Sequence, residues 1–398
     1  MTNARYFLEG IMVLDCTRLL PGAVASLYLA DMGAEVIKIE QPGVGDYARR
    51  LGAEPDTDGP LFRMTNRNKK SVTLNLKTEK GRQIFMDLAA QADVILEGYR
   101  PGVADALGIN YEVCRSVNHL LIYASLTGWG QNGPHASLAG HDLNYLSVAG
   151  LTGLSTSSDG EPVVPGTQVA DLNGSVQAVI AILGALYGRR MTGEGVYLDV
   201  AMLDGVLTWE VVAASEQFSS GRVVEPRGHP LTGGVVSYNV YPTKDGRYVS
   251  LGAVEPKFWR AFCEAVGHSE WIERQVAPAD RRGFHRELIE LFESKTLAEW
   301  TKLGEREDCC LFPVLTMEEV WEHPQVKSRE ITTEWGTEDA ERTVGFRFPI
   351  RMSGGRPGAK QGKDMVSAPR LGEHNLEVLG RIGLSQEELA RLTREGVM

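Results

Sequence analysis

Asp171 is the acidic residue best placed to do chemistry, because it directly precedes a long apolar segment, residues 176–187, that has the composition of a helix. The first turn of a helix has unpaired N–H groups and a partial positive charge, and both favour an anion there. Asp171 can therefore be a helix N-cap with no further role. It can also be a carboxylate that is kept ionised and directed at a substrate, as a nucleophile or a base. Asp171 alone leaves both interpretations open.

Three other residues could take part in the same chemistry. His141 lies near the start of a predicted helix, where a histidine can transfer protons or only form structural hydrogen bonds. Glu255 follows a predicted strand and precedes a helix, so it can be a base or an ordinary N-terminal helix charge. Arg100 lies in a loop after a predicted strand, where it can bind an anion or face solvent. Sequence distance alone does not bring these side chains together.

Several common kinds of site are not predicted. The first predicted strand is not followed by G-x-G-x-x-G, and the chain has neither a P-loop nor a G-x-S-x-G elbow. The cysteines and histidines have no metal-binding spacing. The basic run 66–71 is expected to face solvent, although it would also suit phosphates. We therefore expect no permanently bound cofactor and no metal.

Composition limits the class of protein. The chain has 398 residues, of which 43% are apolar and 23% charged, as is typical of a globular protein of two domains. Its net charge of −11 argues against nucleic-acid binding. The five cysteines match no disulfide pattern, the first residues do not resemble a signal peptide, and we see no apolar run of about 18 residues. We therefore expect a cytoplasmic protein without membrane contact.

The elements that must position these residues alternate along the first third of the chain. Short apolar runs predict buried strands, and helical segments separate them. The expected strands are 11–15, 35–40, 72–76, 93–96 and 120–126, and the expected helices are 23–32 and 79–91. This order predicts an α/β fold with a mostly parallel sheet and helices on both faces. Ligands bind such sheets beyond the carboxyl ends of the strands, so the loops there are expected to form the site.

The pattern changes after about residue 220. Residues 235–241 and 247–251 alternate as strands around the turn Lys244-Asp245-Gly246, which predicts a hairpin. Amphipathic helices are expected at 256–267, 283–294 and 297–303. We therefore expect a large domain formed by residues 1–205 and 335–398, a linker at 206–224, and a smaller α+β domain with its return linker at 225–334.

Six segments together resemble the class III coenzyme A transferases, also called the formyl-CoA transferase or CaiB/BaiF family. That superfamily includes the α-methylacyl-CoA racemases. The segments are LADMGAEVIKIE (29–40), NRNKKS (66–71), RPGV (100–103), VAD (169–171), TGEG (192–195) and GEHN (372–375). The family fold is a Rossmann-like, CoA-binding large domain plus a small domain, with two chains threaded as linked rings. The resemblance therefore implies an interlocked homodimer.

In this family the counterpart of Asp171 is the nucleophile. The implied reaction passes through an aspartyl anhydride and an aspartyl-CoA thioester, and it moves CoA from an acyl-CoA, such as succinyl-CoA, to a small carboxylic acid. The resemblance further implies that CoA binds at Leu19, Leu20, Leu74, Lys77, Gly98, Tyr99 and Arg100. Two features depart from the family pattern. Gln41 replaces an arginine that often contacts phosphate, and no segment matches the glycine-rich lid of the oxalate-using members.

Two alternatives remain open. The racemases use a histidine and an aspartate on opposite sides of an α-carbon, supported by a glutamate and an arginine, and His141, Asp171, Glu255 and Arg100 match those four. The segments 43–46 and 66–71, however, resemble a transferase insertion that racemases shorten, so we favour the transferase. The chain could also be one subunit of a hetero-oligomeric transferase, although the presence of Asp171 argues against an inactive scaffold.

Overall fold

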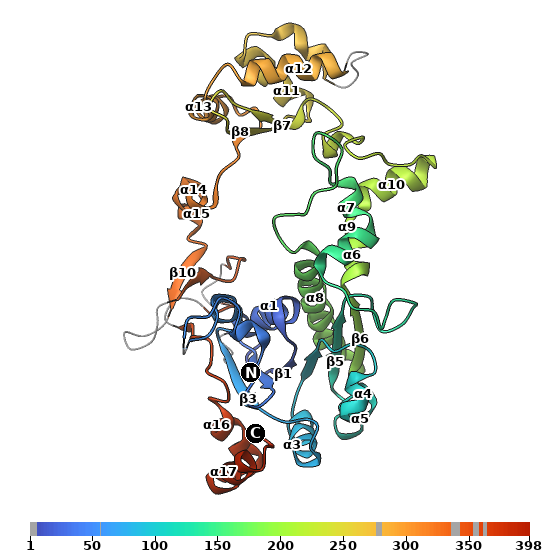
Figure 1. Ribbon diagram of the computed structural model, residues 1–398, viewed down its shortest axis with the longest axis vertical. Helices are drawn as coiled ribbons and strands as arrows, with labels where there is room; N and C mark the ends of the chain where they lie inside the picture. The colour runs from blue at the N-terminus through green and yellow to red at the C-terminus, as the bar shows by residue number, and fades with distance from the viewer. Residues whose placement is uncertain (1–5, 56, 276–280, 336–342, 353–357, 361–363) are drawn as a thin grey trace. The chain divides into compact units, whose positions relative to one another are not determined.

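The computed structural model describes residues 6–55, 57–275, 281–335, 343–352, 358–360 and 364–398 (Figure 1). Contacts within the chain divide it into two compact units. The first unit consists of Met1–Ala149, Pro165–Trp209 and Glu330–Met398, and the second of Gly150–Val164 and Glu210–Arg329. Residues 206–224, where we expected a linker, contain the end of one helix and the whole of another.

Six parallel strands form the sheet of the first unit, in the order β3-β2-β1-β4-β5-β6. The strands are β1 (Met12–Cys16), β2 (Glu35–Glu40), β3 (Lys69–Thr73), β4 (Val94–Glu97), β5 (Ile122–Thr127) and β6 (Val196–Ala201). The predicted α/β fold with a parallel sheet is therefore confirmed. The strand order reverses between β1 and β4, which makes their carboxyl ends the switch point at which such sheets bind ligands.

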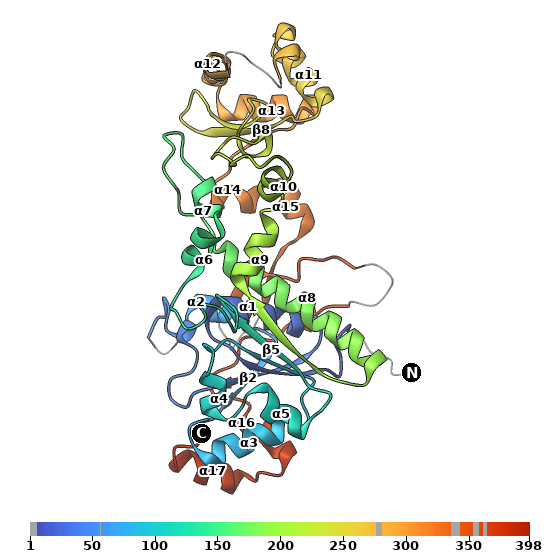
Figure 2. The ribbon, with the colours of Figure 1, turned by 90° about the vertical axis from the view of Figure 1, so that its right-hand side faces the viewer.

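Helices cover both faces of this sheet. Figure 2 shows α1 and α8 on one face and α3, α5, α16 and α17 on the other. The helices of the first unit are α1 (Leu19–Asp31), α2 (Pro60–Thr65), α3 (Glu79–Ala89), α4 (Val103–Leu107), α5 (Tyr111–Val117), α6 (Asp142–Ala149), α8 (Val169–Thr192), α9 (Met202–Trp209), α16 (Asn375–Leu379) and α17 (Gln386–Arg394). The C-terminal helices complete the core, since Val378, Leu389 and Leu392 pack with Ile84 and Phe85 of α3.

The long apolar helix α8 differs from the expectation in length. It has 24 residues and extends well beyond the predicted 176–187. Among the described residues it alone is long and apolar enough to cross a bilayer, so the statement that no apolar run approaches that length is wrong. In the structure α8 lies against α1, α6, α9 and the sheet, and 44% of its most apolar 18-residue window is buried. Its Gly174 and Ser175 are buried, and the Ser175 hydroxyl donates to the Pro21 carbonyl at 2.7 Å.

The second unit contains the predicted hairpin. β7 (Tyr238–Pro242) and β8 (Tyr248–Gly252) pair antiparallel, and β9 (Leu311–Pro313) pairs with β8. One face of this sheet packs on an aromatic core that includes Trp259, Phe292 and Trp300. The unit's helices are α7 (Leu151–Leu154), α10 (Val211–Ser220), α11 (Pro256–Ala265), α12 (Arg281–Phe292), α13 (Leu297–Glu307), α14 (Met317–Glu322) and α15 (Pro324–Arg329). The antiparallel pair β10 (Thr332–Trp335) and β11 (Thr343–Phe346) belongs to the first unit.

The basic run 66–71 is buried, so the expectation of a solvent-facing charge run is wrong. β3 begins at Lys69, three residues before the predicted strand, and the side chains of Arg67 and Lys69 are both only 2% exposed. Arg67 pairs with the buried Asp31. Lys69 Nζ donates to the Ser26 hydroxyl at 2.8 Å and lies 3.4 Å from Asp15 Oδ2. The side chains of Arg67 and Lys69 therefore form ion pairs inside the fold and do not form a phosphate-binding surface.

A second buried lysine, Lys38 of β2, fixes the loop between β1 and α1. Its Nζ donates to the Thr17 carbonyl at 2.9 Å and forms an ion pair of 2.9 Å with Asp46 Oδ2. Asp46 Oδ1 in turn accepts the N–H of Leu19 at 3.1 Å, where the backbone has a positive φ of 61°. Burial opposes charge on Lys38, but its acidic neighbours Asp15 and Asp46 raise its pKa above the ordinary value. The loop conformation thus depends on a buried cation.

We expect Lys38→Met to lower the free energy of unfolding by about 3–5 kcal/mol, because it leaves buried carboxylates without a partner. The measurement is urea unfolding followed by circular dichroism at pH 7. The exposed Lys80 of α3 provides the matched control, since Lys80→Met should stay within about 0.5 kcal/mol of the wild type. Equal stability of the two variants would contradict the role assigned to Lys38.

Candidate active site

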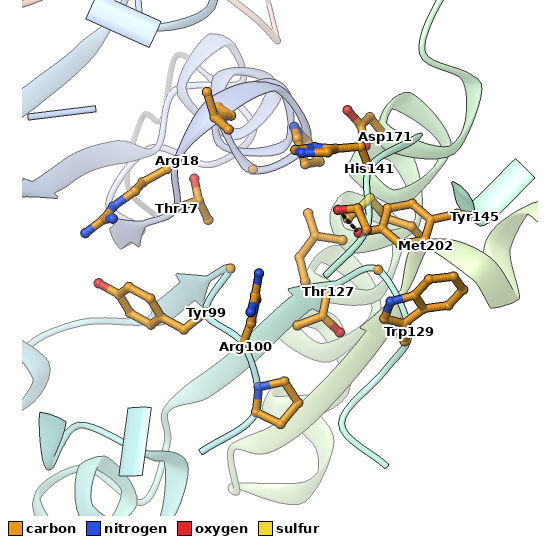
Figure 3. Close-up of a pocket in the computed structure, with 18 of the residues that line it drawn as sticks. Thr17, Arg18, Tyr99, Arg100, Thr127, Trp129, His141, Tyr145, Asp171 and Met202 are labelled. Carbon is orange, nitrogen blue, oxygen red and sulfur yellow. Dashed lines mark hydrogen bonds between the residues drawn. The ribbon is translucent and has the colours of Figure 1, made fainter. Parts of the chain in front are cut away.

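A cavity of about 370 Å³ opens at the carboxyl ends of β1, β4 and β5 (Figure 3). The loops after β1, β2, β4 and β5 and the first turns of α1, α6, α8 and α9 line it, so every contributing element belongs to the first unit. The residues used below are Thr17, Arg18, Leu19, Tyr47, Gly98, Tyr99, Arg100, Thr127, Gly128, Trp129, Gly140, His141, Tyr145, Asp171 and Met202. The cavity therefore lies at the switch point of the parallel sheet, as the strand pattern predicts.

The structure brings together six of the predicted site residues. Two acid–base candidates and four CoA-binding candidates line this cavity, namely His141, Asp171, Leu19, Gly98, Tyr99 and Arg100. Leu20 is half-buried in α1, Leu74 belongs to the hydrophobic core, and Lys77 is exposed. Glu255 is in the second unit, where it precedes α11 as its N-cap residue. The roles of these four remain predictions.

Asp171 is in the first turn of α8, and it does not cap the helix. The N-cap residue is Gln168, whose side chain makes no capping hydrogen bond. Asp142 of α6 caps α8 instead, because its Oδ1 accepts the N–H groups of Ala170 at 2.7 Å and Asp171 at 3.1 Å. The interpretation of Asp171 as the N-cap is therefore wrong. Its carboxylate is not used by the helix and faces the cavity (Figure 3).

The surroundings of Asp171 make its carboxyl group weakly acidic. Burial is the largest cause, and the negative charge of Asp142 adds to it, while His141 acts in the opposite direction. Together they raise the pKa of Asp171 to about 6. The group is therefore mostly ionised at neutral pH, although it lies in a poorly solvated wall. Such a carboxylate is more reactive than an exposed one because less water stabilises its charge.

His141 and Tyr145 lie on the same side of the cavity as Asp171, with His141 directly before α6 and Tyr145 in its first turn. The backbone of His141 is held by the Asn144 side chain, whose Oδ1 accepts the His141 N–H at 3.0 Å, and its imidazole is exposed beside Asp171 (Figure 3). The Tyr145 hydroxyl donates to the Gly140 carbonyl at 2.6 Å. Burial first, and then the charge of Asp171, raise the pKa of Tyr145 to about 12. Tyr145 therefore stays protonated and neutral at physiological pH.

Two glycines make room for Tyr145. A Cβ built on Gly128 would lie 2.1 Å from the Tyr145 ring, and one on Gly140 would lie 2.7 Å from it. Trp129 then packs edge-on against the same ring, with centroids 4.8 Å apart. Its indole Nε1 is buried and has no acceptor among the residues that the structure describes. The loop after β5 thus builds a rigid aromatic wall opposite the β1–α1 loop.

The loop after β4 is held by another buried carboxylate. Glu97 Oε2 accepts the N–H of Tyr99 at 2.6 Å, and burial raises the pKa of Glu97 above its ordinary value. Arg100 follows directly and lines the cavity. Arg18 lines it from the β1–α1 loop, where its guanidinium stacks over the Tyr47 ring and donates to the Tyr47 hydroxyl at 3.0 Å. Two cations therefore border a cavity in a protein of net negative charge.

Several residues that line this cavity were not predicted from the sequence. Thr17, Arg18, Tyr47, Thr127 and Met202 were not proposed as site residues. The available signal was position, since Thr17 and Arg18 follow β1 at the switch point and Thr127 ends β5, the strand next to β4. Asp142 was missed because its neighbour His141 is the more obvious chemical group. Among the described residues, no cluster of His, Cys, Asp and Glu could hold a metal ion.

Comparison with known proteins relates this geometry to a family. The family model described as CoA-transferase family III matches residues 8–375. Human alpha-methylacyl-CoA racemase is 32% identical over 98% of this chain and 97% of its own length. Human succinyl-CoA:glutarate CoA-transferase is 33% identical over 94% of this chain and 86% of its own. Formyl-CoA:oxalate CoA-transferase of Streptomyces avermitilis is 33% identical over the full length of both.

A solved structure shows the same fold. The crystal structure of a CAIB/BAIF family protein from Brucella suis covers 95% of this chain and all of its own, with a TM-score of 0.80 and 30% identity. The match extends over both units of the chain, and the sequence matches include both transferases and racemases. The chain belongs to CoA-transferase family III.

Proposed function

We propose that this protein is a CoA-transferase that moves CoA from an acyl-CoA donor to a carboxylic acid through Asp171. One observation carries the proposal: the half-buried Asp171 carboxylate lies in the cavity wall, while Asp142 satisfies the helix N–H groups in its place. A carboxylate in this state suits nucleophilic attack on a thioester. CoA would lie along the β1–α1 and β4–α4 loops, near Arg18 and Arg100.

The proposed reaction proceeds by four exchanges at carbonyl carbons. Asp171 attacks the donor thioester, the C–S bond breaks, and an aspartyl anhydride and CoA thiolate form. The thiolate attacks the aspartyl carbonyl, which releases the donor acid and leaves an aspartyl-CoA thioester. The acceptor carboxylate attacks this thioester, giving a second anhydride and free thiolate. The thiolate then attacks the acceptor acyl carbon, so the new acyl-CoA leaves and Asp171 is regenerated.

Each step builds negative charge on a carbonyl oxygen, so the site must supply hydrogen-bond donors. The loop after β5 carries one such group, the indole N–H of Trp129, which has no acceptor among the described residues. Tyr145 is neutral at physiological pH and its hydroxyl already donates to Gly140, so its ring shapes the wall. Leu20, Leu74 and Lys77 remain in the proposed CoA site on the family resemblance alone.

The family resemblance also supports an interlocked homodimer as part of this proposal. In such a dimer the large domain of one chain and the small domain of the other complete each active site. Glu255 would then act in the site of the other chain. A hetero-oligomeric transferase is the alternative assembly, and the presence of a suitable nucleophile in this chain supports the homodimer.

A racemase that inverts the α-carbon of a 2-methylacyl-CoA is the second candidate function. The observation that favours it is the position of His141 and Asp171 on one cavity, within electrostatic range of each other. A thioester acidifies its α-proton, so one group could remove that proton while the other returns it to the opposite face. The two candidates differ in whether Asp171 forms a bond to carbon.

Trapping of the intermediate tests this difference. After addition of succinyl-CoA, borohydride should reduce the Asp171 acyl intermediate to an alcohol, and mass spectrometry of the peptide measures it. We expect Asp171→Asn to lose both the label and CoA transfer to a panel of acids, by more than about 1,000-fold, because the nucleophile is gone. His141→Ala should keep the label. An unlabelled Asp171, together with solvent deuterium exchange into a 2-methylacyl-CoA that requires His141, would instead establish the racemase.

The charge of Asp142 should set the pH dependence of the reaction. Because ionised Asp171 is required, kcat/KM should fall below about pH 6, the pKa of that group. Asp142→Asn keeps an oxygen that can cap α8 and removes the charge, so it should move this acid limb to lower pH. The control is Asp204→Asn, the same change in the first turn of α9 at an exposed residue. An acid limb that does not move in Asp142→Asn contradicts the assignment.

The raised pKa of Asp171 should also cost stability. The folded pKa of about 6 lies above the ordinary value of 3.8, so the folded state holds the proton more tightly, and stability decreases as pH rises through 6. Asp171→Asn should therefore be more stable than the wild type at pH 8, by about 1–2 kcal/mol after allowance for solvent at the half-buried side chain. The difference should vanish near pH 4. Urea unfolding at both values measures it, and a less stable variant at pH 8 would refute it.

A further inference from the structure

The loop after β4 carries a cation that has room on two sides. Arg100 lines the cavity that contains Asp171, and it also lines a second cavity of about 250 Å³. Its side chain is exposed, and it forms no ion pair with any residue that the structure describes. Figure 3 shows Arg100 projecting from this loop into the first cavity. The backbone of the loop therefore decides where the guanidinium lies.

Two hydrogen bonds fix that backbone, one on each side of Arg100. On the C-terminal side, the Arg100 carbonyl accepts the Val103 N–H at 3.1 Å where α4 begins, and Pro101 restricts the residue before it. On the N-terminal side, the Tyr99 N–H donates to Glu97 Oε2 at 2.6 Å. The first bond lies within the loop, whereas the second connects the loop to the last residue of β4. Glu97 is therefore the anchor that joins this loop to the sheet.

Glu97 is itself held by the two neighbouring strands. Parallel pairing places it opposite Ser125 of β5, and the Ser125 hydroxyl hydrogen-bonds to its carboxyl group. The Tyr197 hydroxyl of β6 donates to Ser125 Oγ at 3.1 Å. Glu97 is 2% exposed and Ser125 is 1% exposed, so water does not compete for these bonds. A chain of hydrogen bonds thus runs from β6 through β5 and Glu97 to the backbone of Tyr99.

The charge of Glu97 is not balanced by a neighbouring cation. Burial is the largest cause that raises the pKa of Glu97, and the negative charge of Asp199 adds to it. The hydrogen bonds from Ser125 and Tyr99 act in the opposite direction, and no cation of the described residues helps them. A buried carboxyl group in this state costs stability. What the carboxyl group supplies in return is an acceptor for the loop.

We infer that Glu97 is a positioning residue, which holds residues 98–100 in the conformation that binds CoA. A loop that is already ordered in its bound conformation binds more tightly, because it loses less conformational freedom on association. The inference rests on the proposed function, since that function assigns CoA to this loop. Glu97 acts only through Tyr99 and Arg100, and the inference adds no chemical step.

Titration calorimetry with free CoA tests this inference without turnover. Glu97→Ala should raise the Kd for CoA about tenfold or more, because the Tyr99 N–H loses its acceptor. Glu97→Gln should stay within about threefold of the wild type, because its amide oxygen can accept the same N–H. A Kd within about twofold of the wild type for Glu97→Ala would overturn the inference. Equal losses in the two variants would also overturn it, because the charge and not the hydrogen bond would then matter.

Ser125→Ala keeps the test decisive if Glu97→Ala does not fold. This variant removes the hydroxyl that holds the Glu97 carboxyl group and leaves Glu97 itself in place. We expect CoA to bind about threefold more weakly, because Glu97 is then less firmly oriented towards Tyr99. If Glu97→Ala is unfolded and Ser125→Ala binds CoA as tightly as the wild type, the inference fails.

Asn118→Ala is the control for a general loss of stability. Asn118 lies just before β5, at the amino ends of the strands, whereas the cavity lies at their carboxyl ends. Its partly buried amide donates to the carbonyls of Ala89 at 3.1 Å and Ala92 at 2.7 Å. The variant should be less stable in urea and keep the Kd for CoA within about twofold. Equal weakening of CoA binding by Asn118→Ala and Glu97→Ala would refute a specific role for Glu97.

Kinetics distinguish positioning from catalysis. In the active transferase, Glu97→Ala should raise KM for the acyl-CoA about tenfold and leave kcat within about threefold, because Asp171 and Asp142 lie on other elements. A lower kcat with an unchanged KM would overturn the inference and leave the transferase proposal standing. The absence of an acyl label on Asp171 in the wild type would refute the transferase, and the CoA titration would still test Glu97.

Discussion

The candidate site depends on the interactions of one buried cation, Lys38 of β2. Lys38 holds the Thr17 carbonyl directly and the Leu19 N–H through Asp46, and so it fixes the loop where β1 enters α1. Lys69 is a second buried cation near Asp15, and burial lowers the pKa of Lys69 to about 8. Removing ions from water is costly, and the carboxylates offset that cost only in one geometry. The loop is therefore held in one conformation beneath the cavity.

Asp142 plays the corresponding part on the other side of the cavity. By accepting two N–H groups of α8, it joins α6, which directly follows His141, to the helix that carries Asp171. The same carboxylate raises the pKa of Asp171, after burial, towards neutrality. One residue thus holds the first turn of α8 and adds to the raised pKa of Asp171. A group kept ionised at some cost to stability is typical of sites selected for chemistry, where stability is exchanged for reactivity.

Much of the fold could be predicted from hydrophobic patterning. β2 was placed correctly at 35–40, and β1, β4 and β5 within two residues, because buried parallel strands are short apolar runs bounded by breaks. β3 was placed three residues late, since Lys69 and Lys70 do not look like strand residues and their partners Asp15, Glu35 and Glu377 are distant in sequence. The register of that strand depends on ion pairs that local patterning does not show.

The sequence by itself determined the α/β order, the family and the nomination of Asp171, His141, Arg100 and Tyr99, because strand periodicity and short motifs are local properties. Only the tertiary structure decided that Asp142, and not Asp171, caps α8, and that Arg18 and Trp129 reach the same cavity. The reason is physical: burial, charge coupling and capping arise between segments that are far apart in the chain, and folding alone brings them within hydrogen-bond distance.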